Sequence, residues 1–86
     1  MTTLIAYHEV DDSKHWLASP KREEVFGPLG ITCRTFVDPE NPNRTAVLCE
    51  IPDMAAFQAV MQSAAGAEAM KYDGVRADTL VTLIEA

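Results

Sequence analysis

Apolar residues are concentrated in four short stretches of the chain, at residues 4–10, 31–37, 46–51 and 80–84. Short apolar runs bounded by turn-forming residues are typical of β-strands. Two further regions, one after the first stretch and one after the third, carry apolar residues at the spacing of an α-helix. The pattern therefore predicts the element order β-α-β-β-α-β, in a single domain that spans residues 1–86.

The first helical region is predicted to consist of two pieces. Candidate N-caps precede a short turn over residues 14–17: Asp11, Asp12 and Ser13. A second start signal follows at Ser19-Pro20, where a hydroxyl cap precedes a proline at the first helical position. We expect the helix that opens there to end before Gly27.

The second helical region has the clearer signal. Asp53 is its expected cap, and Gly66 is expected to interrupt it. Gly74 is a good C-terminal stop, so the last strand is predicted over residues 79–85. Apolar side chains recur at helical spacing on one face of this region: Phe57, Val60, Met61 and Ala64.

The predicted order is that of the split βαβ in ferredoxin-like α+β domains, with a four-stranded antiparallel sheet. Such a chain supplies helices for only one face of its sheet. Both alternating sets of side chains in the first strand are partly apolar, with Leu4 and Ala6 on one face and Ile5 and Tyr7 on the other. We therefore expect a partner to cover the second face.

The two cysteines fall in the two central strands. A hairpin that matches the apolar faces of residues 31–37 and 45–51 makes Cys33 and Cys49 neighbours. Opposite Cβ atoms in a sheet are about 4.5–5.5 Å apart, wider than the roughly 3.8 Å that a disulfide prefers. We expect free, buried thiols. Neither CxxC nor HxxxH spacing is present, so the sequence predicts no metal site.

Charge and length narrow the range of partners. The net charge is −6, with 13 acidic and 7 basic side chains, and such a field repels nucleic acid. No apolar run approaches a membrane span, so no membrane partner is expected. The N-terminal residues lack the basic and long apolar regions of a signal peptide. A cytoplasmic protein is the expectation.

Four side chains are candidates for chemistry. His8 shares a face with Leu4 and could shuttle a proton as a catalytic residue, although a core or interface histidine with a satisfied hydrogen bond is the more common occupant of such a position. His15, Trp16 and Tyr72 are candidates for substrate binding, and Trp16 is also a natural anchor of its helix on the sheet.

Two charged groups have structural interpretations. Arg34 lies in the middle of a strand, and Glu50 on the neighbouring strand is its expected ion-pair partner. Lys21 and Arg22 are expected on a solvated helix face. Met54, Met61 and Met70 are expected to fill the core rather than to form a cofactor site.

The element order, the chain length, the first-strand His8, the two-part second helix and the terminal strand resemble the dimeric α+β barrel superfamily. That superfamily includes antibiotic-biosynthesis monooxygenases, muconolactone isomerases, polyketide cyclases and haem-binding enzymes. The resemblance implies a homodimer whose sheets pack face to face, with a pocket between each sheet and its helices. Some cyclase-like members use a first-strand histidine as acid or base, and His8 matches it by position.

Two functions follow as hypotheses. One is a homodimeric small-molecule enzyme of cyclase, isomerase or monooxygenase type that needs no cofactor, with His8 as the proton carrier. The alternative is a non-enzymatic module that binds a metabolite or a partner protein through the same fold. The sequence does not specify the ligand.

Overall fold

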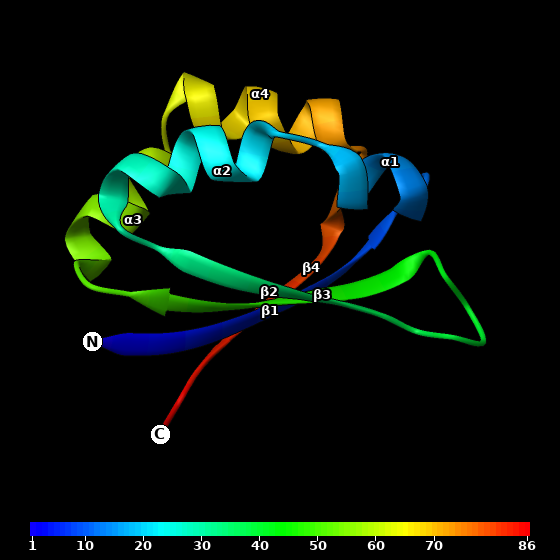
Figure 1. Cartoon of the computed structure of the whole chain (residues 1–86), viewed down its shortest axis with the longest axis horizontal. Coiled ribbons are helices and arrows are strands. Elements are labelled where there is room, and N and C mark those ends of the chain that lie inside the picture. Colours follow the sequence, from blue (N-terminus) through cyan, green and yellow to red (C-terminus); the bar gives the residue numbers. More distant parts are fainter.

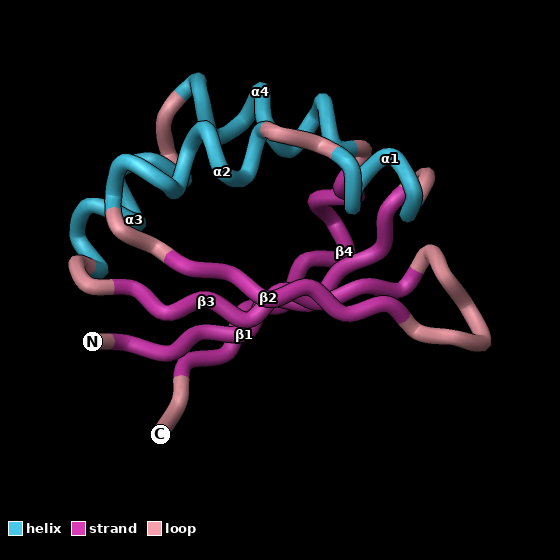
Figure 2. The backbone as a smooth tube through the Cα atoms, viewed as in Figure 1, coloured by secondary structure: helices cyan, strands magenta, loops and turns pink.

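Four antiparallel strands form one sheet in the order β2-β3-β1-β4, and every helix lies on the same face of it (Figures 1 and 2). The computed structural model describes all residues, 1–86. The strands are β1 (Thr2–Val10), β2 (Thr32–Val37), β3 (Arg44–Ile51) and β4 (Val75–Ile84). The predicted ferredoxin-like α+β fold with a four-stranded antiparallel sheet is confirmed.

Each predicted helical region is divided in two. The helices are α1 (Ser13–Ala18), α2 (Lys21–Phe26), α3 (Met54–Met61) and α4 (Ala64–Asp73), and a 3-10 turn, η1 (Gly27–Leu29), follows α2. These bounds place the break in the second helical region at residues 62–63, and not at Gly66 as the sequence suggested. Gly66 instead lies in the first turn of α4. No helix is long and apolar enough to cross a membrane.

Short polar side chains begin three of the four α-helices, and α2 begins without a side-chain cap. The Asp12 carboxylate accepts hydrogen bonds from two backbone N–H groups of α1. Asp53 does the same for α3, as the sequence predicted. Ser63 begins α4, where its hydroxyl accepts from the Gly66 N–H and donates to the Val60 carbonyl. This double use of one hydroxyl explains why the chain breaks at Ser63.

Gly74 ends α4 in the left-handed conformation, with φ 72°, as the stop signal predicted. The strand that follows, β4, begins at Val75, which is earlier than the predicted start at residue 79. Its register against β1 shifts between Tyr7 and Glu9. Thr79 occupies this irregularity, where its hydroxyl accepts from the Glu9 N–H at 2.8 Å and donates to the backbone carbonyl of Arg76.

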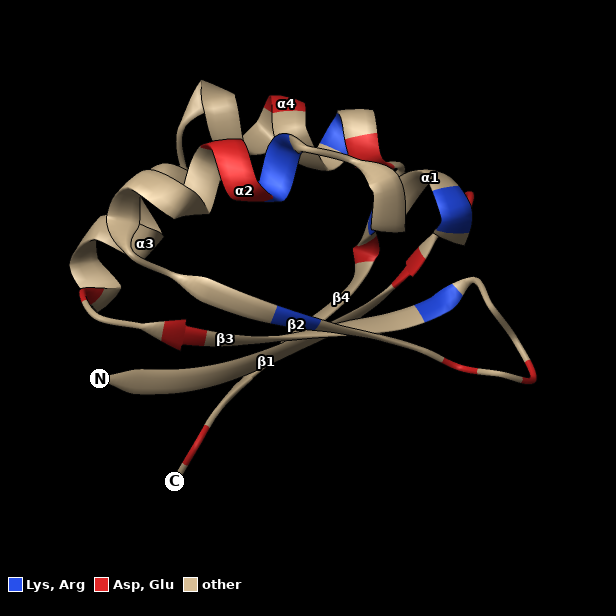
Figure 3. Ribbon diagram, viewed as in Figure 1, with Lys and Arg blue, Asp and Glu red and all other residues tan.

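The core lies between the sheet and the helices. Its seven buried hydrophobic residues are Leu4, Val10, Trp16, Ile31, Val47, Cys49 and Ile51. The predicted hairpin register is confirmed, since Cys33 is opposite Cys49 and both thiols are free. Most charged residues lie on the helices and at the ends of the strands, so the middle of the sheet is largely uncharged (Figure 3).

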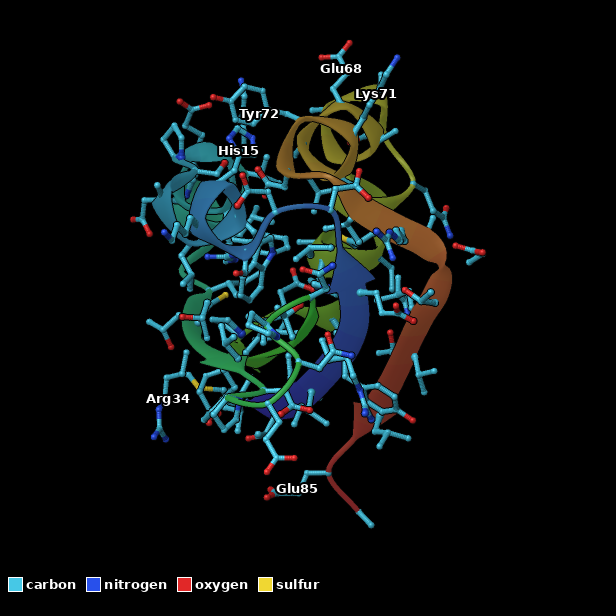
Figure 4. The ribbon with its side chains drawn as sticks, turned by 90° about the vertical axis from the view of Figure 1, so that its right-hand side faces the viewer. His15, Arg34, Glu68, Lys71, Tyr72 and Glu85 are labelled. Carbon is cyan, nitrogen blue, oxygen red and sulfur yellow. The ribbon has the colours of Figure 1, made fainter.

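Arg34 is the exception in the middle of the sheet, and the predicted ion pair with Glu50 is wrong. In the register, Arg34 is opposite Leu48. The Glu50 carboxylate instead accepts a hydrogen bond of 2.8 Å from the Thr3 hydroxyl on the next strand. Arg34 points out from the sheet edge (Figure 4), with its guanidinium 5.7 Å from the centre of the Phe36 ring.

Candidate functional site

A largely apolar cavity of about 100 Å³ lies between the helix-facing side of the sheet and the four helices. Seventeen residues line it, and thirteen of them are hydrophobic. Strands β1, β3 and β4 form one wall, and all four helices contribute to the others. The polar or charged side chains in this lining are few, and three of them matter for chemistry: His8, Arg22 and Asp73.

His8 enters the cavity from the middle of β1, where alternation directs it to the same face as Leu4. Its side chain is 7 % exposed. The Thr45 hydroxyl on β3 donates to the backbone carbonyl of His8 at 3.1 Å and lies 3.0 Å from His8 Nδ1. We assign the single hydroxyl proton to the carbonyl, which can only accept, and in this assignment Thr45 accepts from the His8 Nδ1–H.

This arrangement leaves the other ring nitrogen of His8 as a base. With the proton on Nδ1, the neutral imidazole presents Nε2 as an acceptor, and Nε2 makes no hydrogen bond within the chain. Burial lowers the pKa of His8 below 6.5, and the positive charge of Arg22 lowers it further. His8 is therefore neutral at pH 7 and able to take up a proton.

Trp16 and Arg22 form the adjoining wall. Trp16 from α1 is 2 % exposed, and its ring meets that of His8 edge to face, with centroids 5.6 Å apart and an interplanar angle of 84°. The Arg22 guanidinium from α2 lies 4.7 Å from the centre of the Trp16 ring. Trp16 thus anchors α1 on the sheet and lines the cavity at the same time. Arg22 is drawn inward, and not onto the solvated face that the sequence suggested.

Two buried polar atoms at this site have no hydrogen-bond partner in the chain: Arg22 Nη2 and Asp73 Oδ1. Asp73 is only 6 % exposed and is the last residue of α4. A negative charge at the C-terminal end of a helix is unfavourable. An unsatisfied buried polar group costs about 1–3 kcal/mol, and more when it is charged. Neither the charge of Asp73 at the end of α4 nor the two unsatisfied polar atoms stabilise the folded chain by themselves.

His15 and Tyr72, predicted with Trp16 to bind substrate, lie together outside the cavity lining. Their rings are 4.9 Å apart, and His15 Nε2 is 2.7 Å from the backbone carbonyl of Tyr72 (Figure 4). The Lys21 ammonium lies 5.3 Å from the centre of the Tyr72 ring. This surface contact holds α1 against the end of α4, next to the lining residues Trp16 and Asp73.

Sequence reasoning missed Arg22 and Asp73. Arg22 follows Lys21, and adjacent basic residues in a short helix resemble a solvated face. Asp73 did leave a signal, because an acidic residue directly before a glycine helix stop is at the wrong end of the helix dipole. Such a misplaced carboxylate was a reason to look for a function there.

A second hollow, of about 500 Å³, is broad and lies at the end of the sheet near the β2–β3 turn, where His8 and Thr45 also contribute to its lining. Its lining is more polar and includes Tyr7, Phe36 and Arg44. No group of three or more His, Cys, Asp and Glu side chains is placed to hold a metal ion. The chemically equipped site is therefore the cavity around His8.

No family model and no curated protein matches the chain by sequence. Solved structures with the same fold do match. A Nitrosomonas europaea protein provisionally named an antibiotic biosynthesis monooxygenase aligns with a TM-score of 0.70 and 14 % identity, covering 100 % of this chain and 97 % of its own. A Bacteroides thetaiotaomicron protein with the same provisional name gives 0.69 and 19 %, with 99 % and 87 % covered.

The same fold also occurs under another name. An ethyl tert-butyl ether D family protein from Bacillus halodurans aligns with a TM-score of 0.56 and 18 % identity, over 100 % of this chain and 98 % of its own. At these identities the similarity concerns the fold alone. It confirms the fold expected from the resemblance to the dimeric α+β barrel superfamily.

Proposed function

We propose that the chain is a small homodimeric enzyme that removes a proton from a small, mostly apolar substrate held in the cavity. His8 Nε2 is the base. The observation that supports this most is that His8, Arg22 and Asp73 converge on one apolar cavity, where two buried polar atoms, Arg22 Nη2 and Asp73 Oδ1, have no partner in the chain. A ligand with its own donor and acceptor would satisfy them.

Each group has a distinct part in this reaction. The Arg22 guanidinium donates to a substrate carbonyl oxygen and stabilises the negative charge that develops there. His8 Nε2 accepts the proton from the adjacent carbon or hydroxyl. The imidazolium so formed is favoured by the negative charge of Asp73, which acts on the pKa of His8 in the raising direction, against burial and Arg22. Thr45 fixes the tautomer throughout.

The enolate or phenolate that results is a common starting point for three reactions. Ring closure, double-bond migration and attack on molecular oxygen all proceed from such an anion, so the same first step serves a cyclase, an isomerase or a monooxygenase. The names of the structural relatives favour the monooxygenase. Trp16 provides the flat wall against which a planar substrate rests. His15 and Tyr72 serve the site indirectly, by fixing α1 against α4.

The bare face of the sheet supports the homodimer. Pairing in register produces a row of apolar side chains across all four strands, which consists of Phe36, Ala46, Tyr7 and Val81. A second row contains Leu48, Ile5 and Leu83 beside Arg34. No helix covers these rows (Figure 1), and Tyr7 is 46 % and Leu83 53 % exposed. A contiguous apolar patch of this kind is typical of an interface.

Proton abstraction can be tested without the natural substrate. Cyclohexanone is a small ketone, and deuterium uptake at its α-carbons in D₂O is followed by proton NMR. We expect the protein to accelerate this exchange above the buffer rate and His8→Gln to abolish the acceleration. Arg22→Gln should reduce it, because the carbonyl loses its donor. Exchange by His8→Gln at the wild-type rate would exclude His8 as the base.

The same samples separate the enzyme from the binding module. If cyclohexanone changes Trp16 fluorescence but its exchange is not accelerated, the cavity binds without catalysis. The dimer is tested by light scattering, where the mass should be twice the 9.4 kDa of the chain. Tyr7→Glu in the centre of the apolar row should give monomers. Lys71 on α4 points to solvent (Figure 4), and Lys71→Gln changes the net charge by the same −1 as Tyr7→Glu, so this control should leave the mass unchanged.

A further inference from the structure

Cys33 and Cys49 form a thiol pair that the proposed reaction does not use. The two residues are directly opposite in the β2–β3 register, and their sulfur atoms are 3.1 Å apart in a thiol–thiol hydrogen bond. Cys33, on the edge strand, is only partly buried, whereas Cys49 is buried. Oxidants therefore have access to one thiol of the pair, and the second lies in contact with it.

The position in the ladder brings the two side chains together. The Asp38 N–H donates to the Arg44 carbonyl at 2.9 Å, which makes that pair a hydrogen-bonded one. Hydrogen-bonded and non-hydrogen-bonded pairs alternate along an antiparallel ladder, so Cys33 and Cys49 occupy a non-hydrogen-bonded position. Cα atoms at such positions are about 4.5 Å apart, within the range of about 4.4–6.8 Å seen for disulfides.

The two thiols differ in reactivity. The pKa of Cys33 is lowered, first because the Cys49 thiol hydrogen-bonds to its sulfur and then because of the positive charge of Arg22. The same hydrogen bond, together with burial, raises the pKa of Cys49. Since the thiolate is the reactive form, Cys33 is the nucleophile and Cys49 remains protonated beside it.

We propose that Cys33 and Cys49 are a reversible oxidation site, at which a hydroperoxide converts the two thiols into an intramolecular disulfide. The Cys33 thiolate attacks one peroxide oxygen; the S–O bond forms, the O–O bond breaks, and the leaving hydroxide or alkoxide takes up a proton. The Cys49 sulfur then attacks the Cys33 sulfenic acid and releases water. With hydrogen peroxide, two thiols and one peroxide give one disulfide and two waters.

The geometry makes this disulfide easy to reduce. Its sulfurs must approach from 3.1 Å to about 2.05 Å, while opposite strand positions keep the Cβ atoms wider apart than a relaxed disulfide prefers. Strained disulfides are the labile ones, so a small thiol should restore the reduced pair. Because Cys49 lines the cavity, oxidation also alters the wall of the site.

The test uses the reduced full chain and hydrogen peroxide. After brief exposure the chain is unfolded in urea, so that both thiols are accessible; iodoacetamide should then label neither cysteine, the intact mass should be lower by two hydrogen atoms, and peptide mapping should link the segments that carry Cys33 and Cys49. Dithiothreitol should restore both labels. Two thiols still labelled after exposure, a link between chains only, or a Cys33 sulfinic acid beside a free Cys49 thiol would each overturn the proposal.

Two variants assign the roles. Cys49→Ala should accumulate a sulfenic acid at Cys33 that dimedone traps. In Cys33→Ser, the remaining Cys49 should be oxidised more slowly than Cys33 is in Cys49→Ala, because Cys49 is buried and burial raises its pKa whichever residue occupies position 33. Circular dichroism verifies that each variant is folded. Equal oxidation rates for Cys49 in Cys33→Ser and for Cys33 in Cys49→Ala would contradict the assigned order.

Discussion

One added methyl group at Gly66 should lower the free energy of unfolding, because it disturbs the packing of the helical layer. It is buried in the first turn of α4, next to the break between α3 and α4. A Cβ at residue 66 would overlap the Val60 carbonyl oxygen and would lie 3.2 Å from the Val60 carbonyl carbon and 3.3 Å from Met61 Cα. All three are backbone atoms, which cannot rotate away.

Two effects of opposite sign set the magnitude for Gly66→Ala. Gly66 is not at a positive φ, so alanine is compatible with its backbone, and helix propensity favours alanine by about 1 kcal/mol. Overpacking against a fixed backbone costs about 1–3 kcal/mol. Because the added methyl group overlaps a backbone oxygen, the cost should lie in the upper part of this range, at about 2–3 kcal/mol. The net loss in the free energy of unfolding is then about 1–2 kcal/mol. The corresponding fall in Tm is on the order of 5–10 °C.

Thermal and urea unfolding, followed by circular dichroism, measure this change. Ala67→Gly is the matched control, because Ala67 is the next residue of α4 and is exposed. It loses helix propensity without changing a packed contact, so it should cost up to about 1 kcal/mol. If Gly66→Ala were as stable as the wild type, or more stable, propensity would dominate and the close approach of α3 and α4 would not be limiting.

Three other changes test the polar site. Thr45→Val leaves the His8 Nδ1–H without an acceptor and should cost about 1–3 kcal/mol in a urea melt, whereas Thr45→Ser should retain most of the stability. Because the pKa of His8 is lowered in the folded state, the unfolded chain binds the proton first as pH falls. The free energy of unfolding of the wild type should therefore decline as the pH falls from about 6.5 toward that lowered pKa. His8→Gln should lack this pH-dependent loss of stability. Identical pH profiles for the two proteins would contradict the burial of a neutral His8. Asp73→Asn should raise the free energy of unfolding by about 1 kcal/mol, because it removes an unsatisfied carboxylate at a helix C-terminus; a loss would identify Asp73 as a structural partner instead.

The strands and their register could be predicted because alternation leaves little freedom. A shift of one residue would have exchanged the buried and exposed sets of β3, so Cys33 had to be opposite Cys49. Side-chain partners across strands are less constrained. Glu50 has neighbours on both sides, and it bonds Thr3 on β1 rather than Arg34 on β2.

The cavity could be predicted only in part. The position of His8 on the helix-facing side follows from alternation, and Trp16 follows from its size and the need to anchor α1. Arg22 depends on how α2 crosses above Trp16, which no local pattern encodes. The early start of β4 depends on a bulge that Thr79 stabilises from 70 residues away in sequence, and local signals do not extend that far.

Strand β1 carries the proposed proton acceptor and the apolar row on opposite faces of the same backbone, with His8 next to Tyr7. Insertion or deletion of one residue before His8 would turn both side chains over together, so the proposed base would reach the outer surface and the proposed interface would lose its central aromatic ring. The two surfaces can therefore diverge by substitution but not by a change in the length of β1. In a directed-evolution library, indels in this strand should be lost while substitutions at either face survive.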